Sequence, residues 1–149
     1  MDQVKVLLVD DEERFLKTTA RFLEKKGFCV QTAVNGAKAL DVLKLMLIHV
    51  MVLDVQMPIL DGFETLKISK KHHPSVEIIM LTGHATVEAA VEGLKTGVFD
   101  YLMKPVDLDD LVLKISAAHL KYQQTQQKKE LAQIKNIIKP MKEIMKDMK

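Results

Sequence analysis

The chain reads VLLVDDE at residues 6–12, where an apolar run that begins at Val4 stops at a group of acidic residues. A short apolar run of this kind is typical of a strand that is buried on both faces. Beyond the acids, apolar side chains recur at helical spacing from Phe15 to Leu23 and end before Gly27, a residue type common just past a helix end. This segment predicts one strand followed by one helix.

The same alternation continues along the chain. Further strands are predicted at residues 28–34, 48–53, 76–81 and 99–103, and further helices at 36–47, 62–72, around 87–94 and from Asp107 onward. Strands that are apolar on both faces need helices on both sides, and five such units suit an open sheet better than an eight-stranded barrel. We therefore expect an α/β fold with a five-stranded parallel, doubly wound sheet and helices on both faces.

Cysteine content and hydropathy bound the class of protein. The single cysteine, Cys29, has no partner for an internal disulfide, which fits a reducing compartment. The most apolar region, residues 45–60, is interrupted by polar residues and a proline and falls short of the ~20 apolar residues of a membrane helix. No secretory signal is recognisable at the start. We expect a cytoplasmic protein without a membrane anchor.

Charge divides the chain into two parts. Residues 1–120 hold 14 Lys and Arg against 17 Asp and Glu, whereas residues 121–149 hold 8 Lys against 3 acids. We expect a globular domain at residues 1–120 and a helical tail, serving as a linker or short coiled coil, at residues 121–149. Lysines spaced along a helix are usually a solvated face, so no nucleic-acid binding is assigned to the domain.

Chemically versatile residues follow the predicted strands. Asp10 and Asp11 come after the first strand, Asp54 after the third, Thr82 after the fourth and Lys104 after the fifth. Open parallel sheets bind ligands beyond the carboxyl ends of their strands, at the point where strand order reverses. The second strand ends in an apolar residue and an asparagine, which favours an edge position for it. These five residues are therefore the candidate site.

Three carboxylates in a partly buried pocket repel one another and raise at least one pKa, and a bound cation removes that conflict. Oxygen-only ligands with room for water and a phosphate favour Mg²⁺. Lys104 supplies a positive charge and Thr82 a hydroxyl donor, which suit the oxygens of a transferring phosphoryl group. The residues themselves thus favour a magnesium-dependent phosphoryl site.

Each residue alone has a simpler interpretation. Acids at the start of a helix complement its dipole, Thr82 could cap a helix, and Lys104 could be a surface lysine. Adjacent His72 and His73 point apart on a helix and predict no metal site. His84 could line the mouth of the pocket. The joint placement of the five residues at strand ends favours the functional interpretation.

Four segments resemble the receiver domain of bacterial two-component response regulators over about residues 4–120. They are VLLVDDE at 6–12, LDVQMPILDG at 53–62, LTGHATVEAAVEGLKTGVFDYLMKP at 81–105 and the helix start at Asp107. The resemblance implies a CheY-like, flavodoxin-like sheet with strand order 2-1-3-4-5. It also implies phosphorylation of Asp54 by a histidine kinase or phosphotransfer protein, and Mg²⁺ held by Asp10, Asp11, Asp54 and the backbone carbonyl of Gln56.

The resemblance assigns roles to the other residues as well. It implies that Thr82 and Lys104 contact the phosphoryl group, that Tyr101 is an aromatic switch and that the Lys104–Pro105 bond is cis. Ile59 departs from the pattern, since a glycine often follows the loop proline in the family. The similarity is greatest to receivers that precede transcription-activating ATPase modules; no such module follows here, and we expect the output to be missing or supplied by another protein.

Three other functions fit the sequence less well. A hydrolase or phosphatase lacks its G-x-S-x-G elbow or spaced aspartate pair, so we expect a phosphoacceptor that is not an enzyme acting on free substrates. A nucleotide- or flavin-binding protein would need glycines where four acids follow the first strand. A receiver-like adaptor that is never phosphorylated would not need the complete site.

The tail carries its own pattern. Its apolar residues are spaced 3, 4, 3, 4 and 3 apart, as in an a/d coiled-coil seam: Leu131, Ile134, Ile138, Met141, Met145 and Met148. Carried backwards, the register meets Gln127, Gln124, Leu120 and Ala117, so the fifth helix could run into the tail without a break. Pro140 is expected to kink or end it. A parallel homodimer and a plain amphipathic linker are both consistent with this pattern.

Overall fold

The computed structural model describes residues 3–57, 61–83, 95 and 97–148. Strands and helices alternate as predicted: β1 (Lys5–Val9), α1 (Glu13–Lys25), β2 (Cys29–Ala33), α2 (Gly36–Leu45), β3 (Val50–Asp54), α3 (Gly62–His72), β4 (Glu77–Thr82), β5 (Asp100–Met103) and α5 (Leu108–Asp147). The helix predicted around residues 87–94 lies outside the described residues. The helix at residues 62–72 has its predicted bounds, and the bounds of the other described elements differ from the prediction by at most two residues.

The five strands form one parallel sheet in the order β2-β1-β3-β4-β5. This confirms the predicted doubly wound sheet and the edge position of β2. The registers pair Val9 with Leu53, Asp54 with Leu81, and Thr82 with Met103. The carboxyl ends of β1, β3, β4 and β5 therefore meet at one edge of the sheet.

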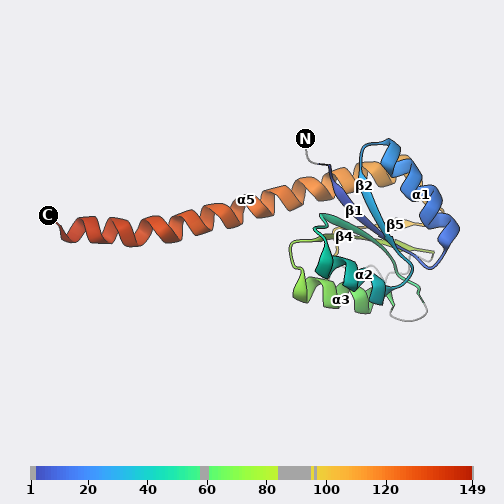
Figure 1. The fold of residues 1–149 in the computed structure, drawn as a ribbon, viewed down its shortest axis with the longest axis horizontal. Helices are drawn as coiled ribbons and strands as arrows, with labels where there is room; N and C mark the ends of the chain where they lie inside the picture. Colours follow the sequence, from blue (N-terminus) through green and yellow to red (C-terminus); the bar gives the residue numbers. More distant parts are fainter. Residues whose placement is uncertain (1–2, 58–60, 84–94, 96, 149) are drawn as a thin grey trace.

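Helices cover both faces of the sheet, with α1 and the start of α5 on one side and α2 and α3 on the other (Figure 1). Alternate residues of each central strand point to opposite layers, so Leu7 packs towards α2 and α3 while Leu8 packs towards α1 and α5. Both residues are almost fully buried. The rigid double layer fixes the positions at which the strands end.

The helix α5 begins at a cap, since the Asp107 side chain accepts hydrogen bonds from the backbone N–H groups of Asp109 and Asp110. It packs on the sheet as far as Ala118 and then continues to Asp147, and all its residues from 127 onward are exposed. Figure 1 shows this part projecting away from the domain. The prediction of a continuous helix is confirmed. The helix does not end at Pro140, so that alternative was wrong.

The structure also bears on membrane insertion. Among the described residues, including the 40 residues of α5, no helix is long and apolar enough to cross a membrane.

Candidate functional site

Asp10 lies directly after β1 and is completely buried. Its backbone N–H continues the sheet by bonding the carbonyl of Ala33, and its Oδ1 accepts the backbone N–H of Glu12 at 2.9 Å. Its Oδ2 lies 2.7 Å from Nζ of Lys104. The side chain is therefore held on both oxygens.

Asp54 is the last residue of β3 and is 5% exposed. Its Oδ1 accepts the backbone N–H of Gln56 at 3.3 Å, and its Oδ2 lies 3.6 Å from Nζ of Lys104. The loop after it returns close to the strand, because the N–H of Gly62 bonds the carbonyl of Val55. A Cβ atom at Gly62 would lie 2.3 Å from the backbone oxygen of Asp54, so only glycine fits here.

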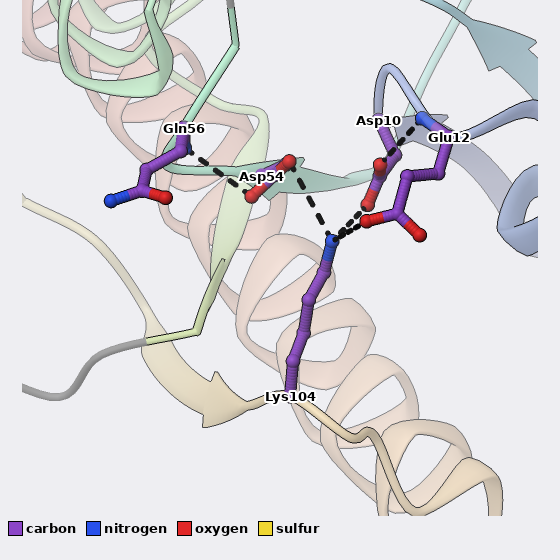
Figure 2. Close-up of polar contacts among 5 residues, drawn as sticks. All are labelled: Asp10, Glu12, Asp54, Gln56 and Lys104. Atoms are coloured by element: carbon purple, nitrogen blue, oxygen red, sulfur yellow. Dashed lines mark hydrogen bonds and ion pairs between the residues drawn. The ribbon is translucent and has the colours of Figure 1, made fainter.

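Lys104 follows β5 and reaches across the carboxyl edge of the sheet (Figure 2). Besides Asp10 and Asp54, its Nζ contacts Oε1 of Glu12 at 3.6 Å and lies 5.1 Å from the ring centre of Phe15. Its backbone N–H bonds the carbonyl of Thr82. The Lys104–Pro105 bond is cis, as the resemblance implied. One lysine thus links acids from the ends of two strands.

Thr82 ends β4 beside these residues and is 4% exposed. Nothing lies within 4 Å of the position that a Cβ atom would take on the neighbouring Gly83. Tyr101, in β5, is half-buried against the apolar layer below α2 and α3. The structure therefore places Thr82 and Lys104 at the ends of adjacent strands, and Tyr101 within β5, where it pairs with Met80 of β4.

Burial controls the charge state of the carboxylates. Removal from water and, next, the nearby charge of Asp10 together raise the pKa of Asp54 to about 6, against the lowering effect of Lys104. Burial also raises the pKa of Asp10, although Lys104 and the Glu12 N–H oppose this. Burial alone would lower the pKa of Lys104, but its bond to Asp10 and the surrounding acids raise it overall. Lys104 therefore stays charged, whereas burial disfavours the ionised form of both acids.

Carboxylate oxygens of Asp10, Asp11 and Glu12 lie within 4.8 Å of one another. Asp54 faces the same lysine as Asp10 and Glu12. A group of hard oxygen donors in which burial disfavours the charged form is the environment that a divalent cation such as Mg²⁺ stabilises. The donors present fit that ion. Gln56, predicted as a backbone ligand, lies beside Asp54 through its N–H bond.

Sequence reasoning placed Glu12 only at a helix start, yet its carboxylate takes part in the site, as does the ring of Phe15. Their positions on the first turn of α1, just past Asp10, could have indicated this. Ile59 and His84 lie outside the described residues. A pocket of about 640 Å³ bordered by Asp11, Gln56 and Asp61 opens beside the site.

Sheet order and site together define the class: a doubly wound α/β protein with an acidic site, crossed by a lysine, at the point where strand order reverses between β1 and β3. Comparison with known proteins gives a narrower answer. The model of the response regulator receiver domain family matches residues 6–116.

Known relatives and structures agree with that match. The transcriptional regulatory protein ZraR of Klebsiella oxytoca is 38% identical over 117 residues, 78% of this chain and 26% of that protein. The DNA-binding transcriptional regulator NtrC of Escherichia coli (strain K12) is 37% identical over 122 residues, 82% of this chain and 26% of that protein. A CheY-like receiver domain from Methanospirillum hungatei JF-1 superimposes with a TM-score of 0.80 at 30% identity, covering 83% of this chain and 99% of that one.

The chain belongs to the response regulator receiver domain family. It spans about a quarter of the length of the curated relatives it matches. Receivers of this family act in two-component systems, where phosphorylation of an aspartate with Mg²⁺ is general. The predicted fold and class of function are therefore confirmed.

Proposed function

We propose that Asp54 is the phosphoryl acceptor of this receiver. Asp54 lies at the end of a central strand, is almost fully buried and faces the lysine that also contacts Asp10. Its raised pKa, about 6, leaves it ionised at neutral pH. This single arrangement of a strand-end carboxylate beside a paired lysine carries the proposal.

Asp10, Asp11, Asp54 and the backbone carbonyl of Gln56 are the residues that would hold Mg²⁺. The bound ion would offset the negative charge that gathers when a phosphoryl group enters this acidic pocket. Glu12 belongs to the same acidic group, and its contact with Lys104 keeps it beside the site. Asp10 and Asp11 would therefore serve in binding alone, whereas Asp54 would both bind the ion and accept the group.

The transfer itself is a displacement at phosphorus. One oxygen of the Asp54 carboxylate forms a new P–O bond while the P–N bond to a donor histidine breaks, and the electron pair of that bond remains on the histidine nitrogen. Lys104 and Thr82 lie where a cation and a hydroxyl donor can hold the equatorial oxygens. The protein supplies position and charge and does not turn over a free substrate.

The donor would be a histidine kinase or a phosphotransfer protein in the cytoplasm. A groove of about 630 Å³ runs from Lys104 and Pro105 along Phe15 and Thr18 of α1. It opens beside the site and is lined by both apolar and polar side chains, as a protein-docking surface requires. We assign the donor to this groove and leave the output to another domain or protein.

Phosphorylation would bias a two-state equilibrium. The added phosphoryl oxygens would draw the Thr82 hydroxyl inward and let Tyr101 take an inward rotamer, because both side chains lie on the adjacent strands β4 and β5. The response would then appear on the β4–β5 side of the domain.

The proposal is tested by labelling the full chain with a radioactive acyl phosphate and Mg²⁺. Wild type and Asp61→Asn should incorporate label, whereas Asp54→Asn should not. Asp61 is a matched control because it is a nearby acid that caps α3 through its side chain, a role asparagine keeps. Equal labelling of Asp54→Asn and wild type, or continuous release of phosphate without a labelled protein, would contradict the proposal.

A further inference from the structure

One face of α5 repeats every seven residues over five heptads. Positions a and d hold mostly apolar residues, and all of them are exposed: Ala117, Gln124, Leu131, Ile138 and Met145 at a, and Leu113, Leu120, Gln127, Ile134, Met141 and Met148 at d. We call this face the α5 seam. It begins on the part of α5 that packs against the sheet and runs to the far end of the helix.

The receiver domain sits on the opposite side of the helix. The α5 residues that pack into the core occupy only positions b, c and f of the same heptads: Leu108, Leu111, Val112, Ile115 and Ala118. Position f lies opposite the a/d seam on a helical wheel. As far as the described residues of the domain extend, a second helix can therefore lie along the whole seam without meeting the receiver domain to which α5 belongs.

A strict seven-residue period identifies the kind of occupant. A straight helix drifts about 20° per heptad against such a repeat, so five heptads would turn the stripe by about 100° on a flat surface. Only a supercoiled partner helix keeps the stripe covered along its length. The period thus favours another helix of the same repeat over a membrane surface.

The residues beside the seam differ between its two flanks. Position e is lysine in every heptad: Lys114, Lys121, Lys128, Lys135 and Lys142. Position g is Ser116, Gln123, Glu130, Ile137 and Ile144. An amphipathic helix on an anionic membrane usually carries its basic residues on both borders of the apolar face. The single basic flank again argues for a helix partner.

The two flanks also select an orientation. In a parallel pair each g residue meets the e′ residue of the next heptad, so the lysines from Lys121 to Lys142 meet serine, glutamine, glutamate and isoleucine in turn. Glu130 then faces Lys135 of the other chain, and Ile137 can pack on the stem of Lys142. In an antiparallel pair e meets e′, which would place lysine against lysine. Charge complementarity therefore favours two parallel copies.

Two lysines of the e flank are already held by their own domain. Nζ of Lys114 lies 2.5 Å from Oδ2 of Asp100 in β5, and Nζ of Lys121 lies 3.7 Å from the buried Oε2 of Glu77 in β4. These pairs fix the rotation of α5 about its own axis, so the seam faces away from the sheet. The seam is thereby presented by the folded domain and does not depend on a free tail.

We propose that a second copy of this chain binds along the α5 seam, forming a parallel two-stranded coiled coil with the two receiver domains on its outer sides. Gln124 and Gln127 form polar layers that fix the register while lowering the stability. The inference is independent of the proposed phosphorylation of Asp54, because no seam residue belongs to that site.

Sedimentation equilibrium of the full chain at tens of micromolar tests the seam. Wild type should be dimeric, and the double variant Ile134→Gln/Ile138→Gln should weaken the dimer roughly a hundredfold or more, because each dimer loses four buried isoleucines. The matched control Ala132→Gln/Asn136→Gln adds the same side chains at positions b and f and should stay dimeric. Melting curves of the full-length variants check that the receiver domain still folds in both.

Reversal of charge tests the orientation. Lys135→Glu should weaken a parallel dimer about fivefold by opposing Glu130, and adding Glu130→Lys in the same chain should restore it. An antiparallel dimer would instead be strengthened by Lys135→Glu. Strengthening of the dimer by Lys135→Glu would overturn the proposal. So would a wild type that is a larger oligomer or a monomer, including a monomer whose seam binds vesicles of phosphatidylglycerol.

Discussion

Nζ of Lys104 lies 2.7 Å from Oδ2 of Asp10, although 94 positions separate the two residues in the chain. Asp10 is completely buried at the end of the first strand, and the lysine comes from the end of the last. A buried carboxylate without a counter-charge is strongly unfavourable. The pair therefore connects the stability of the domain to the chemistry of its site.

Lys104→Met should lower the free energy of unfolding by about 1–3 kcal/mol at neutral pH without Mg²⁺. Asp10 would keep its burial and lose its partner, and the pKa of Asp10 and of Asp54 would rise further. The loss should be smaller in mild acid, where both acids can take up a proton. Urea unfolding measures this, with Lys114→Met, which removes a half-exposed pair to Asp100, as the control. A larger effect in the control would refute the assignment.

Asp54→Asn should stabilise the metal-free protein at neutral pH. The folded pKa of Asp54 is about 6 against 3.8 for the free side chain, so the folded state binds more protons between these values. The contribution of Asp54 to the stability of the wild type therefore falls as pH rises from about 4 to about 6, and the variant lacks this contribution. The difference should be absent near the lower pH and approach about 3 kcal/mol above the upper one.

Urea unfolding at a series of pH values checks the pH dependence of Asp54. Millimolar Mg²⁺ serves as the internal control, because it should stabilise wild type and remove the advantage of the variant. If the difference in free energy of unfolding between wild type and variant stays constant across the pH range, the pKa of Asp54 is not raised by folding.

Magnesium should raise the melting temperature of wild type and have a much weaker effect on Asp11→Ala. The ion binds only the folded site and relieves repulsion among its acids. Asp61→Asn, which leaves the proposed ligands intact, should respond as wild type does. Equal shifts in wild type and Asp11→Ala would remove Asp11 from the metal site.

Gly62→Ala should destabilise the domain by about 2 kcal/mol or more, because the new Cβ atom would lie 2.3 Å from the backbone oxygen of Asp54. Since that backbone carries the proposed acceptor, labelling of Asp54 should also slow. Gly83→Ala is the matched control, as nothing lies within 4 Å of its added atom. Thermal melts and labelling rates compare the two, and similar stability of both variants would exclude the close approach.

Phosphorylated Lys104→Ala should carry label yet respond weakly in structure. Asp54 remains able to accept the group, but the charge that would hold the phosphoryl oxygens in place is gone. Amide NMR spectra of the β4–β5 side should change on phosphorylation in wild type and much less in the variant. A full response in the variant would assign the switch to Thr82 alone.

The sheet was predictable because β1, β3 and β4 are short apolar runs that turn polar at the carboxyl edge. The residues at which helices and strands end were less predictable. The second helix was predicted to reach residue 47 but ends at Leu45, since Met46 adopts an extended backbone and the sequence has no glycine or proline there to indicate a stop. β3 was predicted to end before Asp54 and includes it, because Asp54 pairs with Leu81 of β4.

The candidate site was predictable as a set of residues but not as a set of contacts. Strand-end positions brought Asp10, Asp54 and Lys104 together, yet the contact of Lys104 with Glu12 depends on how α1 approaches the edge. Glu77 is a comparable case at the other end of the sheet. A glutamate in an apolar strand would be expected at the surface, but it is 4% exposed beside Lys121 of α5.

The length of α5 gives it the properties of a lever. The turns from residue 108 to residue 122 contact the domain, the last of them through Lys121 with Glu77 and Tyr122 with His49, whereas residues 123–147 extend roughly 38 Å beyond them. A tilt of about 5° at the anchored end would move Asp147 by about 3 Å, and each residue inserted along the arm would rotate whatever is attached there by about 100°. Small movements of β4 and β5 would therefore turn the far end of α5 and shift it by a larger amount.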